Sequence, residues 1–60
     1  SWDLIQLLIS LFVRANGDPR GTSDRTIAQY FAVLNSQFPA AAELVNAIQS
    51  VVERLRLSRA

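Results

Sequence analysis

The alternation of hydrophobic and polar positions divides the chain into three stretches, each with the spacing of an α-helix. In the first stretch, residues 2–15, polar side chains recur every three or four residues and form one narrow stripe, made of Asp3, Gln6, Ser10 and Arg14. Every other position is apolar, whereas a surface helix usually buries a face somewhat wider than about 100°. The stretch is too short for a membrane span, which needs about 20 apolar residues. We therefore expect a buried or interfacial helix that is covered on several sides.

Capping and turn residues mark the expected ends of this first helix. Ser1 can act as its N-cap, where a hydroxyl accepts a hydrogen bond from a free backbone N–H. Gly17 suits the left-handed conformation that often follows a helix C-terminus. The residues that come next, 18–21, read Asp-Pro-Arg-Gly and are typical of a turn.

Two further helices follow this turn. Thr22 or Ser23 can cap a helix over about 24–37, whose apolar side chains recur on one face at Ile27, Tyr30, Phe31, Leu34 and Phe38. Pro39 disfavours helical geometry at the residue before it and is suited to begin a third helix, over about 39–57. The apolar face of that helix carries Ala41, Leu44, Val45, Ile48, Val51, Val52 and Leu55.

The pattern as a whole predicts an all-α fold, a small bundle of three short helices packed mainly antiparallel. We expect one domain over residues 1–60, with a core shared by all three helices. Its predicted members are Leu8, Leu11, Phe12, Ile27, Phe31, Leu34, Ile48 and Val52. Two helices of this length cannot cover nearly the whole circumference of the first, so we expect a partner chain or dimerisation to complete the bundle.

Composition supports the need for a partner. A chain of 60 residues buries only about 60% of the surface that it exposes when unfolded, and small domains usually gain stability from disulfides, a metal or another chain. This chain has no Cys and no His, which leaves a second chain as the natural source of further burial. The net charge of +1 makes nucleic acid an unlikely main partner. No signal-peptide layout precedes the first helix, and we expect a cytoplasmic location.

The sequence offers little that could carry out catalysis. It has five carboxylates, and no two of them lie at a helical spacing that would form an acid–base couple; they are Asp3, Asp18, Asp24, Glu43 and Glu53. The two glycines around the first turn do not form a phosphate-binding pattern. We therefore expect no enzyme activity, no cofactor and no metal site.

The expected partner interface combines the apolar first helix with the basic end of the third. Its predicted residues are Trp2, Leu4, Ile5, Leu8, Ile9 and Phe12, together with Arg54, Arg56 and Arg59. The three arginines match the negative end of a helix dipole, and that role alone would explain them. Alternatively, they select a partner helix that carries acidic residues.

A different function is suggested by the segment Ser23-Asp24-Arg25-Thr26-Ile27-Ala28-Gln29-Tyr30. This segment resembles the recognition helix of helix-turn-helix DNA-binding proteins, and the likeness extends over Thr22 to Leu34. However, the connection from the first helix is longer than the usual three or four residues, and a DNA-binding domain generally carries more positive charge. DNA binding is therefore the alternative to protein binding.

The chain as a whole resembles the helical docking domains at the ends of modular polyketide synthase subunits. The shared traits are an Arg-rich, Lys-free composition, amphipathic segments over 27–38 and 44–55, and the turn Gly17-Asp18-Pro19-Arg20-Gly21. Such domains have no catalytic chemistry and join the C-terminus of one subunit to the N-terminus of the next. The resemblance implies that a few charged residues around an apolar seam choose the partner.

Overall fold

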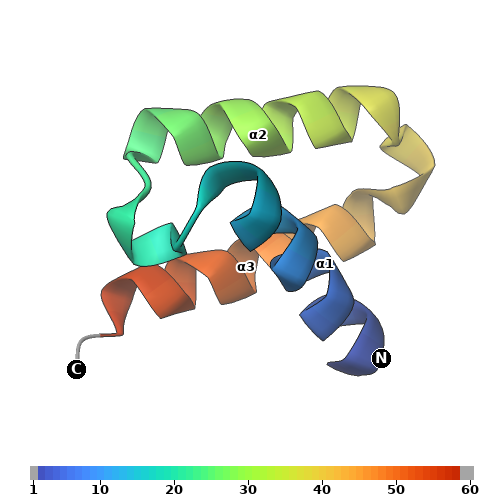
Figure 1. Cartoon of the computed structure of the whole chain (residues 1–60). Helices are drawn as coiled ribbons and strands as arrows, with labels where there is room; N and C mark the ends of the chain where they lie inside the picture. The colour runs from blue at the N-terminus through green and yellow to red at the C-terminus, as the bar shows by residue number, and fades with distance from the viewer. Residues whose placement is uncertain (1, 59–60) are drawn as a thin grey trace.

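The protein folds into three helices, seen here in a computed structural model that describes residues 2–58 (Figure 1). The helices are α1 (Trp2–Asn16), α2 (Asp24–Gln37) and α3 (Ala42–Leu57). Two short 3₁₀ turns, η1 (Pro19–Gly21) and η2 (Pro39–Ala41), precede α2 and α3. The described residues contain no strand, so the predicted all-α class is confirmed. The predicted N-cap, Ser1, lies outside the described residues.

The helix ends follow from local chemistry. Gly17 adopts a φ of +89°, and its N–H donates to the carbonyl of Val13 over 2.7 Å, which ends α1 as predicted. Of the two candidate caps for α2, Ser23 is the one used, because its Oγ accepts from the N–H of Thr26 at 3.1 Å. The third helix begins in two steps, since Pro39 starts a 3₁₀ turn before the regular helix takes over.

The three helices are not all aligned. Figure 1 shows α2 and α3 running antiparallel and joined through η2, whereas α1 crosses α3. Helix α3 packs against both of the others and against η1. The prediction of antiparallel packing therefore holds for α2 and α3 but not for α1.

The core lies where α1 crosses the other two helices, and aromatic rings form its centre. Phe12 is fully buried; its ring lies 5.0 Å from that of Tyr30, edge to face, and 6.0 Å from that of Phe31, stacked. The buried apolar residues are Phe12, Ile27, Phe31, Val45, Ile48 and Val52. Leu8 and Leu34 only border this core, and Leu11, predicted to be inside, is 46% exposed. That prediction was wrong because Leu11 points about 100° away from the neighbouring Phe12 around the helix, toward a side of α1 that the other helices leave exposed.

One ion pair links the end of α3 to the start of α2. The guanidinium of Arg56 pairs with the carboxylate of Asp24 and donates a hydrogen bond to the carbonyl of Thr22, over 3.4 Å. Thr22 itself is buried, and its hydroxyl donates to the carbonyl of Asp18 at 2.8 Å. These contacts, together with the buried ring of Pro19, fix the loop against α3.

Candidate protein-interaction surface

Helix α1 exposes apolar side chains on both sides of its buried strip. Phe12 lies at the centre of that strip, flanked by the half-buried residues Ile5, Leu8, Ile9 and Asn16. On one side lies a row that we term the leucine flank: Leu4, Leu7 and Leu11, of which Leu7 is 58% exposed. On the other side lie Trp2 and Val13, which are also exposed. The core thus covers one side of α1 and leaves two apolar flanks in contact with solvent.

The leucine flank continues into an apolar groove between α1 and α2. Six residues line this groove, which has a volume of about 270 Å³: Leu8, Leu11, Tyr30, Leu34, Phe38 and Ile48. A neighbouring hollow of about 260 Å³ shares four of them and extends to Ala41, Leu44 and Val45. Phe38 is 54% exposed at the rim of the groove, because the following Pro39 ends α2 there. The exposed leucines and the groove therefore form one continuous apolar surface.

The opposite flank of α1 meets α3 over a shallower surface. Trp2 lines a depression of about 400 Å³ together with Val51, Arg54, Leu55 and Ser58. The structure thus brings together Trp2 and Arg54, two of the residues predicted to form the interface. The indole is 60% exposed there, which leaves most of it accessible to another molecule.

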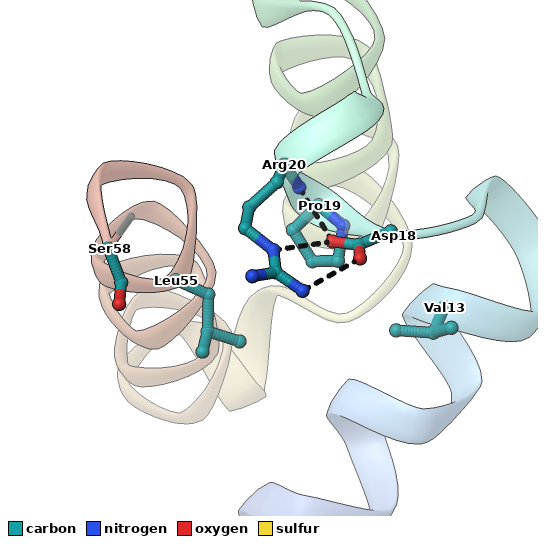
Figure 2. A pocket seen from close by; sticks show the side chains of 6 residues that line it. All are labelled: Val13, Asp18, Pro19, Arg20, Leu55 and Ser58. Carbon is teal, nitrogen blue, oxygen red and sulfur yellow. Dashed lines mark hydrogen bonds and ion pairs between the residues drawn. The ribbon is translucent and has the colours of Figure 1, made fainter. Parts of the chain in front are cut away.

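A fourth hollow, of about 300 Å³, lies between the ends of α1 and α3 and the η1 turn (Figure 2). Its two charged side chains pair with each other: Arg20 donates to Asp18 from Nε at 3.3 Å, from Nη2 at 3.1 Å and from its backbone N–H at 2.9 Å. Hydrogen bonds from Arg20 lower the pKa of the Asp18 carboxyl, and the same pair raises the pKa of Arg20. Because both charges are already paired, this hollow offers no free ionic group to a ligand.

Two of the predicted interface residues have other roles in the structure. Phe12 is enclosed by the chain's own core, so its side chain cannot touch a partner. Arg56 is half-buried and engaged with Asp24 and the carbonyl of Thr22, so its charge serves the fold. Arg54 is exposed, while Arg59 lies outside the described residues. The predicted group of three free arginines is therefore reduced to Arg54 among the described residues.

The apolar surface includes three residues that the sequence prediction left out of the interface: Leu7, Leu11 and Phe38. For Leu7 the signal was present, because at about 3.6 residues per turn it lies directly beside the polar stripe that holds Asp3 and Arg14. An apolar residue next to a solvated stripe faces away from the core. Leu11 lies one position further around the helix, where the sequence gives no such signal. For Phe38 the signal was its position immediately before a proline, where a helix ends.

Within residues 2–58, no group of three or more acidic, His or Cys side chains is arranged to hold a metal ion. No helix in that range has the length and apolarity to cross a membrane. The start of α2, the segment that resembles a DNA-recognition helix, carries Asp24, whose carboxylate pairs with Arg56.

Comparison with known proteins gives no match: no family model, no curated protein and no solved structure is significantly similar to this chain. The geometry of the apolar surface therefore carries the functional argument.

Proposed function

We propose that this chain is a non-catalytic, cytoplasmic module that binds another protein chain, as a docking or dimerisation domain. The observation that supports this most directly is the continuity of the leucine flank with the groove beside it. Monomeric domains rarely expose a contiguous apolar patch larger than a few hundred Å² unless the patch binds something. The groove lining has no charged side chain, and its one polar group, the Tyr30 hydroxyl, offers little to orient a small polar ligand.

The magnitude of the exposed surface is consistent with this function. The exposed parts of the three flank leucines add up to about one and a half leucine side chains, and covering them stabilises the protein by about 2–4 kcal/mol. A domain of this length has a total stability of only about 3–9 kcal/mol. Covering the flank would therefore change the stability of the folded chain by a large fraction.

The resemblance to docking domains of polyketide synthases agrees with such a surface. In those proteins an apolar seam supplies affinity and charged residues beside it select the partner. Charged residues border the exposed apolar side chains here as well: Asp3 and Arg14 lie beside the leucine flank, and Arg54 lies beside Trp2. A charge at the edge of a seam changes selectivity more than affinity, because a wrong partner brings like charges together.

Site-specific photo-cross-linking in living cells tests the proposal. A photoreactive amino acid at position 7 should cross-link to protein, whether a second copy or a different chain, because the Leu7 side chain lies at the centre of the flank. The same amino acid at position 33 is the matched control, since Val33 is equally apolar and 52% exposed on α2, outside the groove. A position-7 variant that yields no protein adduct, or no more than the position-33 variant, would refute the proposal.

A further inference from the structure

Two opposite charges lie along the same edge of the leucine flank. At about 3.6 residues per turn, Asp3 and Arg14 fall on one side of Leu7, near opposite ends of α1. They are 11 residues apart, or about 16 Å along the helix axis. Both side chains are exposed, and neither forms an ion pair with another residue between 2 and 58. The flank therefore has an acidic end and a basic end.

From this arrangement we infer that the occupant of the leucine flank is a second copy of this chain, with the two α1 helices antiparallel. The inference rests on the proposed function and names its partner. A two-fold axis near Leu7 places Leu4 of each copy on Leu11 of the other. The same axis places Asp3 of each copy beside Arg14 of the other, so that two ion pairs form at once. A two-fold interface uses the same patch twice and requires a patch that complements itself in this way.

The spacing along α1 fits this pairing. Leu4 and Leu11 are seven residues apart, which is about two helical turns, and with Leu7 they follow the three-four spacing of a coiled-coil seam. When the leucines are aligned, Asp3 and the opposing Arg14 differ by about 3 Å in height along the axis. The long side chain of Arg14 can span that difference.

The charges also decide the orientation. In a parallel pair, the two-fold axis runs along the seam and places the charged edges of the two copies on opposite sides of it, so that neither Asp3 nor Arg14 faces a charge of the same edge on the other α1. The antiparallel pair brings the two charged edges together, which gives both Asp3 and Arg14 an opposite charge as a neighbour, and it sets the helix dipoles in opposite directions. One polar group near the seam already has a partner, since the Ser10 hydroxyl donates to the carbonyl of Gln6 at 3.0 Å. Covering that hydroxyl leaves no unpaired donor.

The available area matches a modest interface. The chain exposes 4403 Å², whereas a folded monomer of 6.7 kDa typically exposes about 3,900 Å². Two copies that each cover about 500 Å² would bury about 1,000 Å², which is the lower end for a specific interface. Phe38, at the rim of the groove next to Leu8 and Leu11, adds apolar area on the side where the second α1 lies.

Charge variants test the pairing by sedimentation equilibrium. Asp3→Arg and Arg14→Asp should each weaken self-association about tenfold at low salt, because each turns two attractions into two repulsions. A mixture of the two variants should recover the affinity of the parent, since every facing pair is then of opposite sign. Glu53→Arg and Arg25→Asp make the same changes in net charge on α3 and α2, and they should leave self-association unchanged.

The outcomes separate the pairing from the proposed function. A parent chain that stays monomeric overturns the inference, as does a mixture of variants that associates no better than either variant alone. If position 7 nevertheless cross-links to a different protein in cells, the proposed function stands and only the identity of the partner is wrong. The absence of both self-association and cross-links overturns both.

The relative orientation of the two α1 helices can be measured by disulfide formation between introduced cysteines, because the natural chain has no Cys that would interfere. Oxidation of a mixture of Leu4→Cys and Leu11→Cys should give more mixed disulfide than random pairing of the two chains would. An excess of either homodisulfide would show parallel helices and overturn the antiparallel arrangement.

Discussion

Replacing Phe12 by Ala tests whether this side chain belongs to the chain's own core or to an interface. The ring is fully buried and contacts the rings of Tyr30 and Phe31. Truncating a buried Phe to Ala costs about 3–5 kcal/mol, which combines lost burial with the cavity left behind. Because a domain of this length has about 3–9 kcal/mol of total stability, the Phe12→Ala chain should be largely unfolded or only marginally folded at 25 °C.

The assay is urea unfolding followed by circular dichroism, at a concentration low enough to keep the parent monomeric. Leu7→Ala is the matched control on the same helix. Because Leu7 is more than half exposed and Ala favours helix formation, we expect this variant to lose less than about 1 kcal/mol. If Phe12→Ala loses no more stability than Leu7→Ala, the assignment of Phe12 to the core is wrong.

Three further predictions concern the loop and the ends of the helices. Gly17→Ala should destabilise the fold by about 1–2 kcal/mol in thermal unfolding, because φ is +89° there, while Gly21→Ala, with equal space around the added Cβ and no positive φ, should cost much less. Equal losses would contradict the backbone argument. Arg20→Gln should raise the pKa of Asp18 toward its ordinary value in an NMR titration. Since the pKa is lowered in the folded chain, this pair stabilises the fold above the ordinary pKa of Asp, and the stabilisation is lost as the pH falls through the lowered value; an unchanged titration would contradict the pairing. Arg56→Gln should cost about 1 kcal/mol by removing the link between α3 and the start of α2, and a variant as stable as the parent would show that the link contributes nothing.

Local patterns in the sequence predicted the helices well. The bounds of α2 were predicted as observed, and those of α1 to within a residue, since Gly17, Ser23 and Pro39 each act on the backbone close to them in the chain. The amphipathic faces of the second and third predicted helices also identified most of the buried residues, including Ile27 and Val52. These features depend on residues close together in the chain.

The sequence could not show which side of α1 is buried. With apolar residues around most of the circumference, periodicity selects no single face, and Leu11 was placed in the core although it is exposed. Which side of α1 is buried depends on how this helix crosses α3, and that crossing is a property of the packed structure. The role of Arg56 also depends on the packed structure. Its guanidinium reaches Asp24, 32 positions earlier in the chain, only after α2 and α3 have packed antiparallel. The dipole argument placed this arginine on the correct helix end but could not find its partner.

The central claim is that protein covers the leucine flank in the cell. Carbene footprinting measures this directly, by comparing the labelling of leucine side chains in the dilute, isolated chain with that of the protein in fresh cell extract. The account predicts that Leu7 and Leu11 are labelled in the isolated chain and protected in the extract, whereas Leu57, which is 81% exposed at the far end of α3, is labelled equally in both. Equal labelling of all three leucines in the two samples would contradict the account.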